Sequence, residues 1–409
     1  MKTHSSIVES KKKQGGLVVV LFTLCLLILL GFAALAIDIN HMILNKSRLQ
    51  NSVDSAALAS SVAIENGSSS RDSIDQSLAT LGETANASGN SELLFGGNYN
   101  QLTQVSNTKY VAEYDDYEVY YYFSNNPTEF GDSVPFQESR DIYTRVVVSD
   151  HSLESYLIHI FGLAKNVSAS AVSGRSSGFK GISNIAPIGI CDQLEDDPDS
   201  NGYIGGKKYA LAGKCSGNND KQCSTPDTGG DIGAGNYNYL RLDGYGNGAD
   251  GVGDAIGGKA PGEFDDGESG IYLIEGEIVT KPGINNGPVT GFNSRFEQVD
   301  GFPPPDPAPL NSESITTFQD YVEAGGSKLG RRTMTVPVVE CDANGNKPVT
   351  ILGFECFFLY QKYDKKEKII WGEFIEGGCP VANGVGGNDP IASGPYRIQL
   401  YKDPYSGES

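Results

Sequence analysis

An uncharged apolar run near the N-terminus constrains this chain more than any other feature. Residues 17–37 read LVVVLFTLCLLILLGFAALAI, with no charged side chain and with Gly31 as the one glycine. At about 1.5 Å per residue, a helix of about 20 apolar residues crosses a hydrocarbon layer of about 30 Å. The run therefore predicts a transmembrane helix at 17–37, preceded by a short segment at 1–16.

The charges that flank this run predict its orientation. Lys2, Lys11, Lys12 and Lys13 precede it, and Asp38 closes it. Because positively charged flanks stay on the cytoplasmic side of a membrane, segment 1–16 is expected inside and the remainder of the chain outside. This topology describes a single-pass anchor that carries a large exterior part.

Two cleaved alternatives to an anchor stay open. A secretory signal has a shorter apolar region, of about 7–15 residues, and ends in small residues such as Ala34-Leu35-Ala36. A type IV prepilin is cut after a glycine such as Gly16, but it carries a glutamate at the fifth following position, where this chain has Leu21. A buried core helix is disfavoured because such helices are rarely apolar all round over this length. An uncleaved anchor is therefore the favoured interpretation.

The composition limits the partners of the exterior part. The chain has 409 residues and a net charge of -20, which disfavours nucleic acid and anionic lipid as ligands of that part. Glycine (51 residues) and tyrosine (21 residues) are abundant, as is typical of turns and short strands. This length leaves room for one or two exterior domains.

Six cysteines follow the apolar run, and a seventh, Cys25, lies inside it, where it is expected to act as a small hydrophobic residue. Even numbers of exterior cysteines are typical of disulfides, so we expect the six to form three bridges. Zinc is the alternative, but its sites use closely spaced cysteine pairs and histidine, and no histidine follows His159. The pairing stays open for Cys191, Cys215, Cys223, Cys341, Cys356 and Cys379.

A helical pattern continues beyond the membrane. Apolar residues recur at steps of three and four within 38–66, as on one face of a helix, and Asn66-Gly67 is a typical helix end. This extension is either a bare stalk or a helix that packs against a globular domain, as in pilin-like subunits.

The remainder of the chain predicts an α+β fold. Region 67–175 is expected to be a pilin-like α+β unit, with a Ser/Gly linker at 173–183 marking its end. Region 176–409 is expected to be a β-rich, glycine-rich exterior domain. The predicted strands of the first region are 117–123, 142–148 and 167–172, with a helix at 153–163. Those of the second are 236–242, 271–279, 331–339, 349–360 and 369–375, with a helix at 313–324.

The N-terminal segment resembles a known family. It combines the basic start, Gly15-Gly16, the apolar run, Ala36-Ile37-Asp38 and the sequence LQNSVDSAALA at 49–59. In this order and spacing, the segment is similar to TadE/TadG-like proteins of the bacterial Flp (Tad, tight adherence) pilus-assembly systems. One physical reason for its small residues is that alanine and serine let helices approach closely.

The resemblance implies a function, a location and partners. The chain would be a structural component of a Tad/Flp pilus-assembly system, acting by protein contacts. It would be anchored in the bacterial inner membrane with its N-terminus cytoplasmic and its bulk periplasmic or extracellular. Its partners would be other pilus-assembly proteins or pilins, not a nucleic acid or a small-molecule substrate. Some TadG-like chains carry a von Willebrand A domain with a D-x-S-x-S motif; this sequence has no such motif and resembles the short type.

One acidic loop is a candidate calcium site. Asp197, Asp199 and Asn201, followed by Gly202, match the first half of an EF-hand loop, in which alternate oxygens converge on the ion. The twelfth position of such a loop is a bidentate glutamate, but here it is Lys208. A second loop, DGYGNGADGVGD at 243–254, is also rich in oxygen ligands, although these residues are equally typical of turns. No other cofactor is expected.

The sequence favours a protein that is not an enzyme. Its four histidines are His4, His41, His151 and His159, and no H-E-x-x-H motif holds any of them. Two alternatives from other classes stay open. One is a surface adhesin or calcium-dependent binding module on a single-pass anchor, and the other is an envelope hydrolase that uses a pair of carboxylates.

The anchor hypothesis predicts the N-terminus of the mature protein. Sequencing of the membrane-bound protein should return a start at or near Met1, because an uncleaved anchor retains its basic flank. A start at Ile37 would instead identify a signal peptide, and a start at Leu17 a prepilin.

Overall fold

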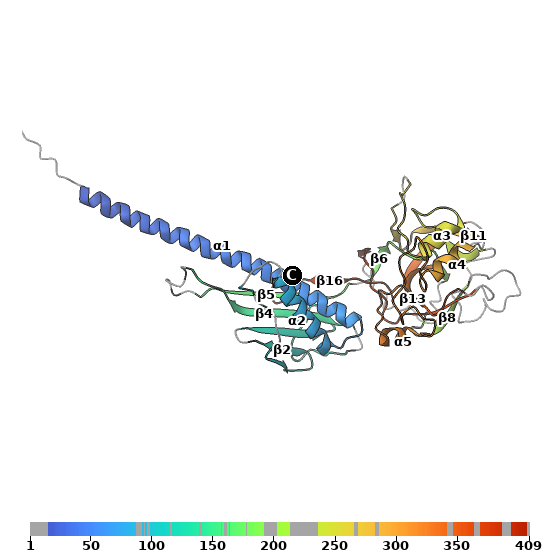
Figure 1. Ribbon diagram of the computed structural model, residues 1–409, viewed down its shortest axis with the longest axis horizontal. Helices are drawn as coiled ribbons and strands as arrows, with labels where there is room; N and C mark the ends of the chain where they lie inside the picture. The colour runs from blue at the N-terminus through green and yellow to red at the C-terminus, as the bar shows by residue number, and fades with distance from the viewer. Residues whose placement is uncertain are drawn as a thin grey trace, which may run out of the picture.

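The chain forms a long helix followed by two units (Figure 1). The computed structural model describes residues 15–86, 92–93, 95, 99–114, 117–138, 141–156, 158, 162, 164–176, 178–191, 203–212, 236–265, 269–282, 286–341, 347–363, 369–386 and 394–406. The proximal unit consists of the second half of helix α1, helix α2 and a six-stranded sheet. The distal unit holds most of the later chain, and the first half of α1 projects away from both units.

Helix α1 (Gly15–Glu65) is one uninterrupted helix of 51 residues, which confirms that the helical pattern continues past the apolar run. It ends as the sequence predicts. The N–H of Gly67 donates to the carbonyl of Ile64 (2.9 Å), and the N–H of Ser68 donates to the carbonyl of Ala63 (3.0 Å). This is the Schellman arrangement, which requires a left-handed residue, and Gly67 has φ 96°. Asn66-Gly67 therefore ends α1 and reverses the chain.

Helix α2 (Ser70–Asn86) packs back along α1. Ser69 caps it: its hydroxyl accepts from the N–H of Asp72 (3.1 Å) and donates to the carboxylate of Asp72 (2.8 Å). Its apolar residues recur at helical spacing and are buried: Ile74, Leu78, Leu81 and Ala85. This face closes one side of the proximal core.

The proximal sheet has the strand order β1-β2-β3-β4-β5-β16, and every neighbouring pair is antiparallel. Side chains alternate between a buried face under the helices and a more exposed face, as is typical of an antiparallel sheet covered on one side. The strands are β1 (Gln101–Gln104), β2 (Lys109–Glu113), β3 (Glu118–Ser124), β4 (Tyr143–Ser152), β5 (Asn166–Arg175) and β16 (Ile398–Tyr401).

The second half of α1 lies on this sheet and shares one core with it. The buried residues of α1 include Leu49, Val53, Ala56 and Ala57, and the sheet contributes residues such as Tyr121. Of the two predicted arrangements, a bare stalk is wrong, and the helix that packs against a globular unit is confirmed.

The distal unit is built around the 12-residue strand β13 (Pro348–Leu359). Strand β12 (Thr333–Val339) pairs with one edge of β13, and β11 and β14 share its other edge. A separate three-stranded sheet has the order β10-β6-β15. The other distal strands are β6 (Phe179–Ile182), β7 (Ile190–Cys191), β8 (Lys208–Ala212), β9 (Asn236–Leu240), β10 (Tyr272–Leu273), β11 (Glu277–Pro282), β14 (Ile369–Phe374) and β15 (Gly384–Gly386).

Two disulfides join segments of the distal unit. Cys191 bonds to Cys341 across 150 residues of sequence, and Cys356 of β13 bonds to Cys379. A cross-link that closes a loop restricts the unfolded chain and so stabilises the folded one. Disulfide formation is thus confirmed for these four cysteines, while Cys215 and Cys223 lie outside the described residues.

Two short helices of the distal unit contact each other through glycine. These are α3 (Ala249–Ile256) and α4 (Asn286–Asn293). A Cβ on Gly253 would lie 2.2 Å from the carbonyl oxygen of Gly287, so only glycine permits this approach. The interpretation of 243–254 as a loop is wrong for its second half, because residues 249–254 belong to helix α3.

Several other predicted elements need correction. The helix predicted at 153–163 is not formed at 153–156, and most of its remaining residues lie outside the described part. The helix predicted at 313–324 is limited to α5 (Phe318–Glu323), and the strand predicted at 271–279 is split into β10 and β11. The assignment of all of 176–409 to one exterior domain is wrong at its end, because β16 pairs with β5 in the proximal sheet.

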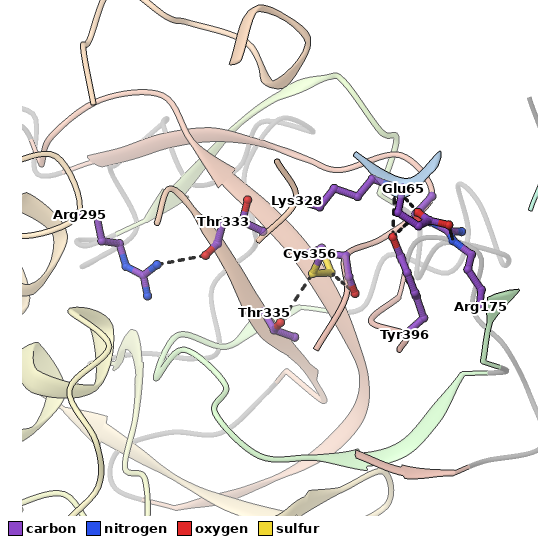
Figure 2. The surroundings of a disulfide bond; sticks show 10 residues. Glu65, Arg175, Arg295, Lys328, Thr333, Thr335, Cys356 and Tyr396 are labelled. Carbon is purple, nitrogen blue, oxygen red and sulfur yellow. Dashed lines mark hydrogen bonds and ion pairs between the residues drawn. A yellow bond between two sulfur atoms is a disulfide. The ribbon is translucent and has the colours of Figure 1, made fainter. Parts of the chain in front are cut away.

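A charged cluster that is largely buried except at Asp141 joins the two units where α1 ends (Figure 2). Arg175, at the end of β5, donates from Nε to Glu65 Oε1 (2.6 Å) and from Nη1 to Asp141 (2.5 Å). Tyr396 OH donates to Glu65 Oε2 (2.5 Å), and the guanidinium of Arg175 stacks 3.8 Å from the Tyr396 ring centroid. From the distal unit, Lys328 lies 3.4 Å from Glu65 Oε2. We call these five residues the junction cluster.

The junction cluster stabilises the charged form of Glu65. Burial alone raises the pKa of Glu65, but the charges of Arg175 and Lys328 and the hydrogen bonds from Arg175 and Tyr396 outweigh it, so the pKa lies below its ordinary 4.5. A carboxyl group whose pKa is lowered by folding adds stability above its unfolded pKa. That stability is lost as the pH falls through the folded value.

Replacing Glu65 should therefore weaken the protein in a pH-dependent way. Glu65→Gln removes the bidentate carboxylate of Arg175 and the partner of Lys328, while Asp141 still contacts Arg175. We therefore expect a loss at or below the lower end of the roughly 3–5 kcal/mol that an unpaired buried charge costs at neutral pH. The difference from wild type should shrink as the pH falls from the ordinary glutamate pKa through the lower pKa of folded Glu65, because the carboxylate then becomes protonated first in the unfolded chain and then in the folded one. Thermal melts of the full chain in detergent across this pH range check the prediction. Glu129→Gln, at an exposed loop position, is the matched control.

Candidate functional site

The first half of α1 is an apolar surface that the rest of the described chain leaves uncovered. The side chains of Leu27, Phe32 and Ile37 are 72%, 67% and 59% exposed. Within the described residues, α1 is the one helix long and apolar enough to span a membrane. From Val18 to Ile37 it extends about 30 Å, the thickness of a hydrocarbon layer. The structure is thus consistent with a single-pass membrane anchor.

The helix enters the proximal unit at Asp38, whose carboxylate is buried. Asp38 Oδ1 lies 3.1 Å from Lys165 Nζ, and both side chains are fully buried. The carboxylate also accepts hydrogen bonds from the backbone N–H groups of Tyr156 (3.0 Å) and Ile158 (2.8 Å). A buried carboxylate with a charged partner and two amide donors has the contacts that offset its desolvation.

Lys165 is held by several acceptors. Its ammonium also donates to the carbonyl of Glu154 (2.9 Å) and to His41 Nδ1 (2.6 Å), and it lies 5.1 Å from the centroid of the Tyr156 ring. The other ring nitrogen of His41, Nε2, lies 3.3 Å from the carboxylate of Glu92 and 3.1 Å from Asn45 Nδ2. We call Asp38, His41, Glu92, Tyr156 and Lys165 the exit cluster.

The exit cluster fixes where the apolar half of α1 ends and the packed half begins. Sequence reasoning identified Asp38 as the end of the apolar run but did not identify its counterion. That counterion is Lys165 of the same chain, 127 residues away. This contact was missed because 153–163 was predicted to be a helix, whereas residues just before Lys165 turn their backbone N–H groups toward Asp38.

The sequence pattern at 49–59 forms the contact between α1 and the sheet. Gln50 Nε2 donates both to Asp54 (2.8 Å) and to the carbonyl of Ser170 in β5 (2.8 Å). Leu49 and Ala57 are fully buried. A little further along, the hydroxyls of Ser61 and Ser173 lie 2.6 Å apart. The spacing of glutamine, aspartate and small residues therefore has a structural reason: it lets α1 lie directly on β5.

The predicted calcium ligands Asp197, Asp199 and Asn201 lie outside the described residues, so their arrangement stays a prediction. Lys208, at the twelfth position of that loop, begins strand β8 and lies 4.2 Å from the centroid of the Trp371 ring. Among the residues that the structure describes, no group of three or more His, Cys, Asp or Glu side chains could hold a metal ion.

One short motif was missed at the sequence level. Residues 174–178 read GRSSG, which has the G-x-S-x-G spacing of a hydrolase nucleophile turn. Such a serine lies between a strand and a helix. Ser176 instead lies between strands β5 and β6, and its hydroxyl accepts from the N–H of Arg397 (3.1 Å). This setting does not match the geometry of that nucleophile.

A comparison with protein families matches most of helix α1. Residues 16–63 match the family described as "Putative Flp pilus-assembly TadE/G-like". The match begins at the apolar run and ends two residues before the end of α1, so it includes Asp38, His41 and the helix face that packs on the sheet. The resemblance of this segment to TadE/TadG-like proteins is thus confirmed. No curated protein and no solved structure shows a significant match to the chain.

The exit cluster predicts a non-additive effect of two substitutions. Asp38→Asn leaves the Lys165 ammonium buried without a counterion, and should lower the free energy of unfolding by roughly 3–5 kcal/mol. Adding Lys165→Met should recover much of this loss, because the unpaired charge is then gone. Thermal melts in detergent compare the single, double and wild-type chains, with Asp132→Asn as an exposed control. Additive losses would show that the two charges do not interact.

Proposed function

We propose that this chain is a membrane-anchored structural component of a Tad/Flp pilus-assembly system, acting by protein contacts in the cell envelope. The family match at 16–63 supports a role related to Flp pilus assembly. The proposal adds that the anchor crosses the bacterial inner membrane with its N-terminus in the cytoplasm and both units beyond the membrane. The three lysines at 11–13 support this orientation.

The observation that carries the proposal is the continuity of α1. One helix supplies both the uncovered apolar half and the half that lies on the proximal sheet, with Asp38 buried at the boundary between them. A flexible tether would let the exterior units move freely, whereas this helix holds the proximal unit at a set height and angle above the membrane. Such a constraint suits a subunit that is assembled with neighbours.

The apolar side of α1 continues past Asp38, which suggests how neighbours are contacted. Ile39, Ile43 and Leu44 are 39%, 58% and 49% exposed, although they lie beyond the boundary that Asp38 marks. Packing of apolar and small residues drives helix association in and near membranes. In this proposal, the uncovered side of α1 is where pilins or other pilus-assembly proteins bind. The proposed role requires no catalysis and no cofactor.

Site-specific photo-crosslinking tests the role. A photoreactive residue at Phe32 or Ile43 in the full chain, expressed in its native cell, should capture pilins or other pilus-machinery proteins. The same residue at Tyr405, which is 59% exposed on the proximal unit, is the control for abundant bystanders. Deletion of the chain should also abolish assembled pili. Normal pili in the deletion strain, together with binding of the chain to a surface or glycan, would favour the adhesin alternative.

A further inference from the structure

The distal unit contains a cavity of about 930 Å³ that the proposed pilus role does not use. It lies beside the three-stranded sheet, between the loop that precedes β12 and the segment that follows Cys379. Ligand pockets in proteins commonly have volumes of about 300–1,000 Å³, so this one has room for a small molecule or a short peptide segment.

The lining of the cavity is basic, although the chain is strongly acidic. Arg295, Lys328, Arg331 and Arg397 line it, and Asp243 is the one carboxylate among the described lining residues. The whole chain has a net charge of -20, so the excess of cationic side chains in this lining is opposite in sign to the charge of the protein as a whole. Lys328 already forms an ion pair with Glu65, whereas Arg295, Arg331 and Arg397 make their contacts with other groups.

Arg331 and Arg295 are held by carbonyl oxygens and not by carboxylates. Arg331 Nη2 donates to the carbonyl of Gly257 (2.7 Å), while Asp306 binds the backbone N–H of Arg331 and not its guanidinium. Arg295 donates to the carbonyls of Ile256 (2.6 Å), Arg331 (2.7 Å) and Thr333 (3.1 Å), and Figure 2 shows it pointing toward Thr333. Each guanidinium is thus positioned by the protein without a hydrogen bond to a carboxylate among the described residues, although the charge of Asp306 lies near both.

Two polar atoms at this place have no hydrogen-bond partner among the described residues: Arg331 Nε and Thr333 Oγ1, both buried. Burial and the nearby charge of Arg331 also lower the pKa of Arg295 to about 9. The charged form of Arg295 is thus destabilised, but it is still the main form at neutral pH. The adjacent Arg332 differs, because five carbonyl oxygens accept its hydrogen bonds and aromatic rings cover it. The hydrogen bonds of Arg332 are therefore satisfied within the protein, whereas Arg295 and Arg331 could still bind an anion.

The rim of the cavity is apolar and exposed. Phe264, Ile271, Leu329 and Val385 line it and are 44%, 43%, 66% and 43% exposed. Val385 belongs to β15, which is an outer strand of its sheet within the described part of the chain. An outer strand has backbone groups that can pair with an extended peptide. The cavity thus combines a cationic floor, an apolar rim and an adjoining sheet edge.

We propose that this cavity binds an extended segment of a partner polypeptide in which an aspartate or glutamate is flanked by apolar residues. The carboxylate binds Arg331 and Arg295, since a planar guanidinium pairs well with a carboxylate. The flanking apolar side chains cover Leu329 and its neighbours at the rim. The backbone of the segment pairs with the outer edge of β15.

Peptide selection on the full chain tests this proposal without assuming a particular partner. A phage library of short random peptides is panned on the full chain in lipid nanodiscs, after depletion on empty nanodiscs. We expect enrichment of peptides with an acidic residue between apolar ones. The best synthetic peptide is then measured by fluorescence anisotropy, where Arg331→Gln should weaken binding by at least about tenfold, as for a desolvated charge pair. Replacing the peptide's acidic residue by its amide should have a similar effect.

Two further variants make the outcome decisive. Leu329→Asn changes an exposed rim residue and should weaken binding severalfold, and it carries the test if melts show that Arg331→Gln does not fold. Arg71→Gln, on the partly exposed surface of α2, is the matched control and should leave binding unchanged. Enriched peptides without carboxylates, or acidic peptides unaffected by both cavity variants, would overturn the proposal. A third outcome would also overturn it: no peptide is enriched, but inorganic phosphate raises the melting temperature of the chain and Arg331→Gln removes that increase. The ligand would then be a phosphate compound.

Discussion

The bidentate contact between Glu65 and Arg175 connects the main parts of this protein, namely the helix, the proximal sheet and the distal unit. Glu65 is the last residue of α1, and Arg175 ends the strand on which α1 lies, so their contact fixes the far end of the helix on the sheet. The same guanidinium donates to the carbonyl of Gly377 in the distal unit, and Lys328 of that unit approaches the same carboxylate. One buried ion pair therefore links the helix, the proximal sheet and the distal unit.

The two ends of the packed half of α1 use the same physical solution. At one end Asp38 is paired with Lys165, and at the other Glu65 is paired with Arg175. In both cases a helix residue meets a charge from beside or within β5, and further hydrogen bonds complete the site. Buried pairs of this kind contribute modest net stability compared with apolar residues, but removing one partner is costly. They therefore specify how far along β5 the helix lies, while the alanine and serine face between them provides the close contact.

The arginines of the distal cavity differ from these pairs. Arg295 and Arg331 are oriented by carbonyl oxygens, and the nearby Asp306 makes no hydrogen bond to either guanidinium among the described residues. An arrangement that positions a buried charge without a direct carboxylate partner costs free energy in the absence of a ligand and is typical of a binding site. The structural charges near α1 and the cationic floor of the cavity therefore have different roles, although both are buried arginine or lysine side chains in an acidic protein.

The sequence by itself determined the features that depend on local periodicity and local sterics. The apolar run, the continuation of the helix, its end at Asn66-Gly67 and the central strands of both units follow from patterns that neighbouring residues create. Asp38 was also identified at the boundary of the apolar run. Only the tertiary structure decided that Lys165 neutralises Asp38, that Tyr396 and Arg175 meet Glu65 across 331 and 110 residues, and that β16 returns to the proximal sheet. Such contacts depend on the path of the whole chain. The sequence pattern around a charged side chain does not indicate which distant residue it will pair with.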